Sequence, residues 1–530
     1  MGTDPLRFID WPHMRIAAID LGSNSFHMLV AEVRGPASFE TVLQEKMMIQ
    51  LGKTALVSGR LDPATIKKGL QCLDEFRRLA LARRVERTLA VATSAVREAE
   101  NGDEFVRRAR EETGIPVRVI SGREEARLIH LAVSRHLDLD GRKCLLVDIG
   151  GGSVELIVGD PERIYYSTSL KAGFLRMHGR FITSDPIRKS EQKALVAYLK
   201  DLLAGPLMRI RRYAPEQLIA TSGSMTSLQR LAALRRGEDP RLSIPSDHVG
   251  QDEIRSLLRD MLALTMVERA KKLDLDPLRA EYLPAALFCL QEVMDGLGFN
   301  EIRVSPVALR EGLVYDFAAR EKLAAVTPPP AGDLRLQSVL ELAGRCDYPA
   351  EHSHRVAEIA VQIFRQIPHL HGLGEREGQL LRYAAILHDI GYYIGYTRHH
   401  KHGYYLVMNC DLRGFTPEER NVLANLVRYH RRAVPSSSHA PFAALTALGQ
   451  KTVKRLAAIL RIADALDRSH FSLVSEVRCR PGRKSIRFDL VTGAGPSALS
   501  LDLEAAHSHA RYFEKVFGVG ATFSVVREAK

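Results

Sequence analysis

Short apolar runs and helical apolar stripes alternate along residues 15–320. A continuous run such as Arg87-Thr-Leu-Ala-Val-Ala92 predicts a buried strand, and apolar residues at helical spacing from 63 to 84 predict an amphipathic helix. We expect strands at 15–20, 26–33, 39–51, 87–92, 117–120, 164–171, 218–220 and 301–305, a hairpin at 144–158, and helices at 63–84, 101–112, 121–137, 174–212 and 251–297. A last helix from Ala308 is expected to close the second half. This alternation of strand and helix predicts an α/β layer.

The pattern changes after a proline-rich segment at 326–332, which predicts a stiff linker because consecutive prolines cannot continue a helix. Residues 334–468 follow a helical pattern. The remainder predicts a small α+β unit with strands at 485–490, 498–503 and 521–526 and a helix at 504–517. At roughly 100–200 residues per domain, 530 residues predict three or four domains. We place the domains at 15–138, 139–325, 333–475 and 476–530.

Two glycine- and serine-rich turns each follow a strand that ends in aspartate. Asp20-Leu-Gly-Ser-Asn-Ser25 lies near the N-terminus, and Asp148-Ile-Gly-Gly-Gly-Ser-Val-Glu155 begins the second half. Glycine lets backbone N–H groups approach an anion, and an aspartate beside them is able to hold the divalent cation that a phosphate chain needs. A single copy also fits an ordinary hairpin with solvated acids. The repeat favours two facing phosphate loops.

The charge balance points to a polyanionic partner, since the formal net charge is +12. No recognisable nucleic-acid module is present, and aromatic residues that stack on bases make up only 6% of the chain. No apolar run approaches the ~18 residues that span a bilayer. The six cysteines are scattered without a Cys-x-x-Cys pair, which favours reduced thiols over disulfides or a zinc site. We therefore expect a cytoplasmic enzyme with no membrane partner and no specific nucleic-acid partner.

The two turns, Ser121-Gly-Arg-Glu-Glu-Ala-Arg127 and Ser305-Pro-Val-Ala-Leu-Arg-Glu-Gly312 together resemble the exopolyphosphatase / guanosine pentaphosphate phosphohydrolase family. The resemblance covers about residues 15–525. It implies an α/β fold of two actin-like (ASKHA, ribonuclease H-like) half-domains with a phosphate-binding cleft. An all-α HD-like domain and a small α+β C-terminal domain follow.

The resemblance also implies roles for individual residues. Glu125 matches the residue that activates water, Asp148 and Asp20 match magnesium-binding acids, and Glu155 positions water or metal. Arg97 is expected to be catalytic together with Glu125 and Glu155. The phosphate-binding residues are Ser23, Asn24, Ser25, Thr93, Ser94, Gly150, Gly151, Gly152, Ser153, Gly223 and Ser224. A hydrolase needs such a set, because an in-line water, a cation and N–H donors act together on the phosphoanhydride. Without the resemblance, Glu124 and Glu125 fit simple charge complementarity at a helix N-terminus.

Four residues of the helical half resemble the metal ligands of HD phosphohydrolases: His352, His388, Asp389 and Asp464, with His354 as an alternative first ligand. His402 and His430 match positions that take a second metal. A lone buried histidine is usually a core residue, but here the residue types follow the family's order. A divalent transition metal is therefore expected. Whether this domain hydrolyses a substrate of its own or only supports dimerisation or substrate guidance stays open.

We expect an exopolyphosphatase that uses Mg²⁺ (or Mn²⁺) to release orthophosphate from inorganic polyphosphate and forms a homodimer. Lys171, Arg176, Arg180 and the run from Arg209 to Arg212 are candidates for guiding the polyanion, although the run also fits a solvated helix face. Hydrolysis of guanosine pentaphosphate is the alternative within the class, since the same residues serve both reactions. An actin-like kinase and a nucleotide-sensing scaffold are the alternatives outside it.

Overall fold

The computed structural model describes residues 14–35, 38–239, 241–321, 334–493 and 496–527. The predicted linker at 326–332 lies outside these ranges. The chain forms two compact units, one built from residues 1–236 and 247–332 and the other from 237–246 and 333–530. Among the described residues, no helix combines the length and the apolarity that crossing a membrane requires.

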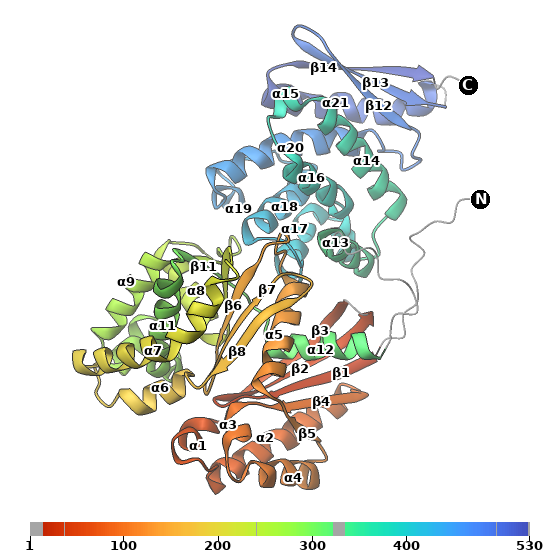
Figure 1. The fold of residues 1–530 in the computed structure, drawn as a ribbon. Coiled ribbons are helices and arrows are strands. Elements are labelled where there is room, and N and C mark those ends of the chain that lie inside the picture. Colours follow the sequence, from red (N-terminus) through yellow and green to blue (C-terminus); the bar gives the residue numbers. More distant parts are fainter. Residues whose placement is uncertain (1–13, 36–37, 240, 322–333, 494–495, 528–530) are drawn as a thin grey trace. The chain divides into compact units, whose positions relative to one another are not determined.

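The first unit contains two sheets with the same strand order (Figure 1). The first sheet runs β3-β2-β1-β4-β5, and the second runs β8-β7-β6-β9-β11 with β10 added at its edge. In each sheet a three-stranded antiparallel meander is followed by two parallel strands. The strands are β1 (Met14–Leu21), β2 (Ser25–Gly35), β3 (Ser38–Met48), β4 (Arg87–Ala92), β5 (Val117–Val119), β6 (Cys144–Ile149), β7 (Val154–Gly159), β8 (Ile164–Leu170), β9 (Gln217–Thr221), β10 (His248–Gly250) and β11 (Glu301–Val304). This duplication is the arrangement that the two aspartate turns predict.

The helices of the first unit cover both faces of each sheet. They are α1 (Gly52–Ser58), α2 (Pro63–Ala82), α3 (Ser94–Glu98), α4 (Gly102–Thr113), α5 (Gly122–His136), α6 (Phe174–Phe181), α7 (Lys189–Arg211), α8 (Gly223–Arg235), α9 (Gln251–Leu262), α10 (Met266–Lys272), α11 (Pro277–Leu297) and α12 (Leu309–Arg320). Along β1, Ile16 and Ala18 pack with α5 and α12, whereas Ala17 and Ile19 pack with α2 and α4. Burial on both faces explains why the strand reads as a continuous apolar run.

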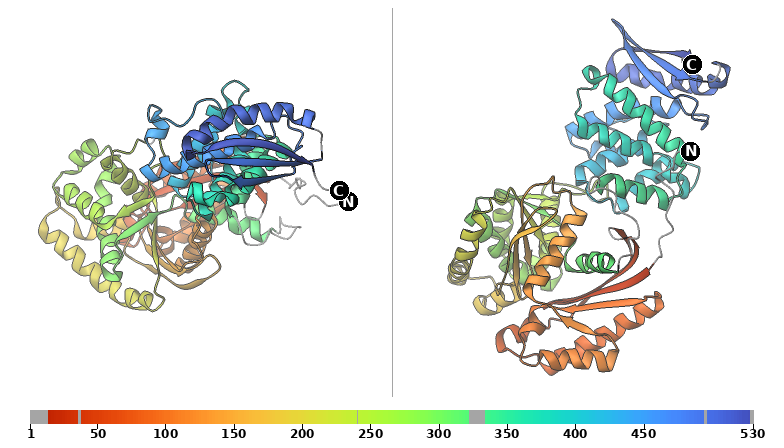
Figure 2. Two further views of the ribbon diagram at one scale, coloured as in Figure 1. Left: turned by 90° about the horizontal axis from the view of Figure 1, so that it is seen from above. Right: turned by 45° about the vertical axis from the view of Figure 1, so that its right-hand side comes forward.

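Helix α12 corrects one prediction. It was expected to close the second half, but it packs against α5 and against β1 and β2 of the first sheet (Figure 1 and Figure 2). A side chain at Gly312 would place its Cβ 2.1 Å from the carbonyl oxygen of Leu128, so glycine is required for this close approach. Nη1 of Arg127 donates to Oδ1 of Asp316 over 2.8 Å and ties the two helices together. The core around α5 and α12 takes residues from both sheets and joins the two halves.

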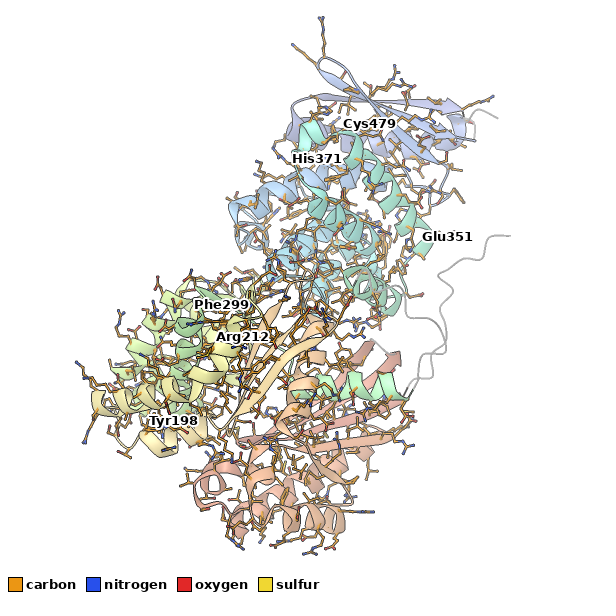
Figure 3. The ribbon with its side chains drawn as sticks, viewed as in Figure 1. Tyr198, Arg212, Phe299, Glu351, His371 and Cys479 are labelled. Carbon is orange, nitrogen blue, oxygen red and sulfur yellow. The ribbon has the colours of Figure 1, made fainter. Side chains whose placement is uncertain are left out.

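The second unit is a helical bundle followed by a three-stranded sheet with the order β12-β13-β14. Its elements are α13 (Leu334–Arg345), α14 (Ala350–Gln366), α15 (Pro368–His371), α16 (Glu375–Leu387), η1 (Ile390–Tyr393), α17 (His399–Asn409), α18 (Pro417–Tyr429), α19 (Ala440–Ala443), α20 (Ala447–Ala465), β12 (Glu476–Pro481), β13 (Ser485–Thr492), η2 (Pro496–Leu499), α21 (Ser500–Phe517) and β14 (Gly520–Arg527). The six cysteines are free thiols, including Cys479 on β12, which is labelled in Figure 3.

The predicted strand at 498–503 is wrong. These residues form the end of η2 and the first turn of α21. Their alternation suggested a strand, but the buried positions Leu499, Asp502 and Ala506 follow a helical spacing. The Asp502 carboxylate is buried because it accepts hydrogen bonds from the backbone N–H and the hydroxyl of Ser469, at 2.7 and 3.1 Å.

The segment 237–246, which leaves the first unit after α8, belongs to the second unit. The backbone N–H of Ile244 donates to Oδ1 of Asn421 over 2.8 Å, and Nδ2 of Asn421 donates back to the carbonyl of Ile244 over 3.0 Å. The hydroxyl of Tyr404 donates to the carbonyl of Leu242 over 3.0 Å. Sequence periodicity did not predict this exchange, since the segment contains neither a helical nor a strand pattern.

Candidate functional site

The two predicted phosphate loops lie directly against each other. Oγ of Ser23, in the turn after β1, is 2.9 Å from Oγ of Ser94 at the start of α3. A Cβ added at Gly151 would lie 3.2 Å from Cβ of Ser23 and 3.4 Å from the backbone nitrogen of Asn24. At Gly152 it would lie 2.3 Å from Oγ of Ser94. The two glycines are therefore needed for the loops to meet, and Ser23, Asn24, Ser94, Gly151 and Gly152 share one site.

The remaining residues of the loops are held by local hydrogen bonds. The backbone N–H of Gly150 donates to the carbonyl of Ser153 over 3.0 Å, which closes the second turn. The hydroxyl of Ser25 lies 2.8 Å from Nε2 of His27, and the N–H of Thr93 donates to the carbonyl of Leu21 over 3.4 Å. All four residues thus border the two loops, with Ser25, Thr93 and Ser153 buried.

Four carboxylates converge beside the loops. Asp148 on β6 and Glu155 on β7 are directly opposite each other in the antiparallel pair. Side chains of opposite residues lie on the same face of a sheet. Asp20 is the second-last residue of β1, and Glu125 lies in the first turn of α5. Glu155 is fully buried, and only 6% of Glu125 is exposed.

The pKa values of these acids show how strongly they interact. Burial, followed by the charge of Glu125, raises the pKa of Asp20 and that of Asp148 to about 7 in each case. Burial also raises the pKa of Glu155, with Glu125 and Asp148 adding to the effect. Burial raises the pKa of Glu125 as well, against the lowering effect of Arg97. Such a group is unstable as four bare anions, so it requires protons or a cation.

The two members of the Glu124-Glu125 pair have different surroundings. Ser121 caps α5 by accepting from the backbone N–H of Glu124 over 3.2 Å. The Glu124 side chain turns outward, where both its oxygens lie 2.8 Å from Nη1 of Arg118. Glu125 points inward, and its Oε2 accepts from Nη1 of Arg97 over 3.1 Å. Helix-end charge complementarity therefore accounts for Glu124 but not for Glu125.

The side-chain oxygens at this site are suited to bind a divalent cation. Within the described part of the chain, Oδ1 of Asp20, Oδ1 of Asp148, Oε2 of Glu155 and Oδ1 of Asn24 are buried without a hydrogen-bond partner. Buried polar atoms without partners are rare in proteins. Carboxylate and amide oxygens are also the ligands that hard cations such as Mg²⁺ prefer.

Three cations near the loops were missed from the sequence: Lys46 on β3, Arg279 on α11 and Arg310 on α12. All three act on His27, whose pKa is lowered to about 3 by burial and by Arg310, Lys46 and Arg279. Nη1 of Arg310 lies 3.3 Å from Nδ1 of His27, and the charge of Arg310 also acts on Asp20. Neutral His27 thus lies among three positive side chains, of which Arg310 also acts on Asp20. A single sequence gives no signal for this cluster, since its members come from three distant elements.

Arg279 connects this cluster with the predicted residues Gly223 and Ser224. Nη1 of Arg279 donates to Oγ of Ser224 over 2.8 Å. A Cβ at Gly223 would lie 2.8 Å from Nη2 of Arg279. The start of α8 therefore holds this guanidinium in place.

Three of the sequence candidates for guiding a polyanion contact other residues of the protein, although Lys171 and Arg180 are exposed. Arg176 donates to the carbonyls of Gly152 and Leu56 at 3.3 and 3.1 Å and to Glu98 at 2.9 Å. Nζ of Lys171 lies 2.8 Å from the same Glu98 carboxylate. Arg180 stacks over the rings of Phe181 and Tyr198. Arg176 consequently braces the second phosphate loop. The cations grouped around His27 are Lys46, Arg279 and Arg310.

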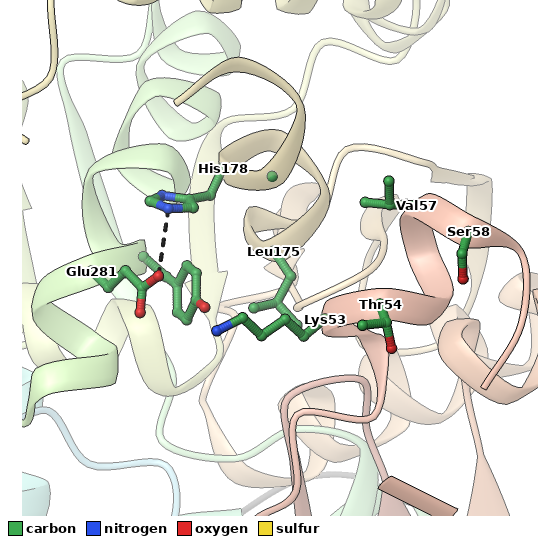
Figure 4. A pocket seen from close by; sticks show the side chains of 9 residues that line it. Lys53, Thr54, Val57, Ser58, Leu175, His178 and Glu281 are labelled. Atoms are coloured by element: carbon green, nitrogen blue, oxygen red, sulfur yellow. Dashed lines mark ion pairs between the residues drawn. The ribbon is translucent and has the colours of Figure 1, made fainter. Parts of the chain in front are cut away.

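A pocket of about 410 Å³ lies beside this site (Figure 4). Lys53 and Thr54 of α1, Leu175 and His178 of α6 and Glu281 of α11 contribute to its walls. Nε2 of His178 lies 3.6 Å from Oε1 of Glu281. Leu175 also packs against Gly151, so the pocket adjoins the second loop and does not contain the four carboxylates.

In the second unit, His352, His388, Asp389 and Asp464 meet at one buried centre. Nε2 of His352 lies 3.2 Å from Nε2 of His388. Oδ1 of Asp464 lies 3.7 and 3.5 Å from these two nitrogens, and Oδ2 of Asp389 lies 4.0 and 3.5 Å from them. Imidazole and carboxylate donors from separate helices are a typical set for a transition metal.

Of the secondary histidine candidates, His402 and the fallback His354 lie outside the groups of close donor atoms, whereas the preferred first ligand His352 lies within one. His399, not His402, joins His430 and Asp389 in a group of close donor atoms. His354, the alternative first ligand, turns its Nε2 to the hydroxyl of Tyr348 at 2.8 Å. His371, labelled in Figure 3, is the ordinary case for comparison: its Nε2 lies 2.8 Å from the carbonyl of Phe364, and its Nδ1 accepts from the N–H of Leu373 over 3.0 Å.

The duplicated sheets and the facing loops define an actin-like phosphohydrolase. The sequence model of the Ppx/GppA phosphatase family matches residues 29–321, and that of its domain III matches residues 334–493. The chain belongs to this family and is a hydrolase.

Relatives support the assignment over both units. The chain is 31% identical over 452 residues to the guanosine-5'-triphosphate,3'-diphosphate pyrophosphatase of Aeromonas hydrophila, covering 84% of this chain and 86% of the relative. An exopolyphosphatase structure from Cytophaga hutchinsonii matches with a TM-score of 0.55 and 29% identity over 59% of this chain and 100% of that one. The Aquifex aeolicus family member matches with a TM-score of 0.50 and 27% identity over 58% and 99%.

Proposed function

We propose that the first unit hydrolyses the terminal phosphoanhydride bond of inorganic polyphosphate and releases orthophosphate. The observation that carries the proposal is the convergence of Glu125, Asp148 and Glu155 on the two facing loops, with unpartnered buried oxygens among them. The cluster of Lys46, Arg279 and Arg310 supports a substrate with many negative charges. A polyphosphate end offers such charge without requiring recognition of a base.

We propose that Asp20, Asp148 and Glu155 hold a divalent cation, Mg²⁺ or Mn²⁺. When bound, the cation would neutralise the charge that develops on the transferred phosphoryl group. The backbone N–H groups of Asn24, Gly151 and Gly152 would donate to the oxygens of that phosphoryl group, because the two loops that carry these N–H groups lie against each other.

Glu125 is the proposed base. Burial raises its pKa, which makes the carboxylate a stronger base toward a proton of the attacking water. Arg97 fixes the carboxylate through Oε2, which leaves Oε1 to orient the attacking water in line with the scissile bond.

Guanosine pentaphosphate is the second candidate substrate. The observation that favours it is the Aeromonas hydrophila relative, which matches along 84% of this chain and is named for a guanosine nucleotide. Arg279 beside Gly223 and Ser224 would then contact the nucleotide while its terminal phosphate occupies the loops.

The test is phosphate release from long-chain polyphosphate and from guanosine pentaphosphate, measured side by side. We expect Glu125→Ala to lower turnover by about 10²–10⁴. Glu124→Ala is the matched control, because its side chain pairs with Arg118 outside the site. Release that survives Glu125→Ala would contradict the proposed base, and release only from the nucleotide would favour the second candidate.

For the second unit we propose one divalent transition metal on His352, His388, Asp389 and Asp464. We also propose that the enzyme acts in the cytoplasm as a homodimer, without a specific nucleic-acid partner. Free thiols support a reducing compartment. The dimer rests on the family resemblance, and sedimentation equilibrium of the full chain tests it.

A further inference from the structure

We propose that a pocket between α5 and β8 binds the orthophosphate product and is the route by which this product leaves the acids. The inference rests on the proposed function, because hydrolysis in the first unit supplies the orthophosphate. The shortened substrate stays on the loops while the cleaved phosphate departs on the other side of the acids.

The pocket has a volume of about 900 Å³ and lies at the outer edge of the second sheet. Residues 164–169 of β8 form one wall. The start of α5, which lies beside β8 in Figure 1, forms another, and Arg320 of α12 contributes a third. All of these elements belong to the first unit. This pocket shares no residue with the one in Figure 4.

A row of residues in register joins the pocket to the acids. In the second sheet Ser169 is opposite Glu155, and Glu155 is opposite Asp148. Asp148 is in turn paired with Thr221 of β9, which leads into the start of α8, where Arg279 is held. Neighbouring strands lie about 4.8 Å apart, so about 14 Å separates the two ends of the row. The pocket and Arg279 are therefore on opposite sides of the two acids.

Ser169 stands between the pocket and the buried Glu155. Oγ of Ser169 donates to Oε1 of Glu155 over 2.7 Å, and the same serine lines the pocket. Helix α5 closes against this serine, because a Cβ at Gly122 would lie 2.4 Å from Cβ of Ser169. The proposed route passes this point, where the Ser169 side chain turns away from Glu155 to let the phosphate through.

The lining of the pocket is suited to a phosphate dianion. Arg123, Arg127 and Arg320 supply three positive charges. Ser167 and Thr168 add hydroxyl groups that are able to donate hydrogen bonds. Arginine is well matched to phosphate, because its planar guanidinium presents a fork of N–H donors to the oxygens.

Arg127 has a donor that no described residue satisfies. Its Nη1 donates to Oδ1 of Asp316 over 2.8 Å, whereas its Nη2 is buried without a hydrogen-bond partner among the described residues. Oε1 of Glu124, at the rim, is 3.9 Å from this nitrogen, and the Glu124 carboxylate is paired with Arg118 instead. Nε of Arg320 lies 2.9 Å from Oδ2 of Asp316, so one aspartate holds both guanidinium groups in place. A phosphate oxygen would satisfy the unpartnered donor.

The first experiment measures binding of radiolabelled inorganic phosphate to the full chain by equilibrium dialysis. Arg123→Met should weaken this binding by about tenfold, because one charged donor to the phosphate is lost. Arg123 is exposed, so the substitution leaves the core intact. Arg135→Met is the matched control, since Arg135 is an exposed residue of the same helix outside the pocket. Equal phosphate binding by Arg123→Met and the parent would overturn the site.

Inhibition kinetics test whether the pocket is separate from the loops. We expect inorganic phosphate to lower the apparent kcat for polyphosphate with little change in KM, because polymer and phosphate occupy different places. Arg123→Met should raise the inhibition constant of phosphate by about tenfold, in parallel with its effect on binding. Purely competitive inhibition would overturn the separate route.

A variant that fills the pocket tests the exit itself. Ser167→Trp places a large ring on the β8 wall and should make release slower than cleavage. Acid quenching measures the phosphate formed, and a fluorescent phosphate sensor measures the phosphate released. A lag between the two is expected in Ser167→Trp but not in the parent, and identical time courses in both chains would overturn the exit.

The dialysis readout does not depend on turnover, so it separates this inference from the proposed function. Phosphate binding that Arg123→Met weakens, in a chain that hydrolyses neither candidate substrate, would support the phosphate site and contradict the proposed function. Hydrolysis of polyphosphate together with phosphate binding that Arg123→Met leaves unchanged would contradict the pocket alone.

Discussion

Arg97 donates from Nη1 to Oε2 of Glu125 over 3.1 Å and, from the same nitrogen, to the carbonyl of Ile120 over 2.8 Å. Ile120 directly precedes the cap residue of α5, so Arg97 fixes both the side chain of Glu125 and the strand end that leads to its helix. This relationship separates Glu125 from its neighbour Glu124 and makes Arg97 a positioning residue.

Arg97→Lys should lower kcat for polyphosphate by roughly 10–100-fold with a smaller change in KM. A lysine ammonium is a compact charge on a flexible stem and does not reproduce the planar guanidinium that holds two acceptors. Steady-state kinetics checks the division between kcat and KM. Arg118→Lys, at the exposed partner of Glu124, should leave both constants unchanged, and equal effects of the two substitutions would contradict the positioning role.

Asp148→Asn should raise the Mg²⁺ concentration needed for half-maximal activity. The substitution removes a negative charge from the proposed cation site while it keeps the size of the side chain. Activity measured over a range of Mg²⁺ concentrations tests this. Asp201→Asn on the exposed face of α7 is the control, and identical metal curves for Asp148→Asn and the parent would count against a ligand role.

Arg279→Met should raise KM for polyphosphate by about tenfold, because that factor corresponds to the free energy of one hydrogen bond to a charged group. It should also weaken the dependence of KM on salt, because one cation that faces the anion is lost. Kinetics at several salt concentrations measures both effects. Arg259→Met, at an exposed position of α9, should change neither, and a loss of kcat alone would assign Arg279 a different role.

Gly152→Ala should abolish activity, since its Cβ would lie 2.3 Å from Oγ of Ser94 and 2.8 Å from Oγ of Ser23. The two loops would be forced apart. Gly205→Ala on α7 is the matched control, because its Cβ would meet no described atom within 4 Å apart from its chain neighbours and the nearby backbone of its own helix. That control should keep activity and gain about 0.5–1 kcal/mol of stability, measured by urea unfolding. Full activity in Gly152→Ala would contradict direct contact of the loops.

His388→Ala should remove transition metal from the second unit without abolishing polyphosphate hydrolysis. His388 lies among the donors of that unit, whereas the proposed acids of the reaction lie in the first. Metal analysis and phosphate release from the same preparation test both points. Loss of metal and of polyphosphate hydrolysis together would show that the two sites are not independent.

The local sequence pattern predicted most of the helices and strands, and it supplied many residues of the candidate site. The apolar runs of β1 and β6, the glycine turns after Asp20 and Asp148, and the order His352, His388-Asp389, Asp464 are all readable along the chain. Short elements such as α1 and β10 were missed because they span only seven and three residues and lack a full period. The strand expected at 498–503 failed because alternation over a few residues also fits the first turn of a helix.

The sequence by itself determined which segments are buried strands and where the two glycine-containing turns lie, because both patterns are carried by neighbouring residues. Only the tertiary structure decided that α12 returns to the first sheet and that Lys46, Arg279 and Arg310 surround His27. It also decided that His399 rather than His402 meets Asp389. These two histidines are three residues apart on α17, and the rotation of that helix is set by close contact with Gly391, where a Cβ would lie 1.9 Å from the carbonyl of His399. Such a contact joins segments that are separate in sequence, so no local period encodes it.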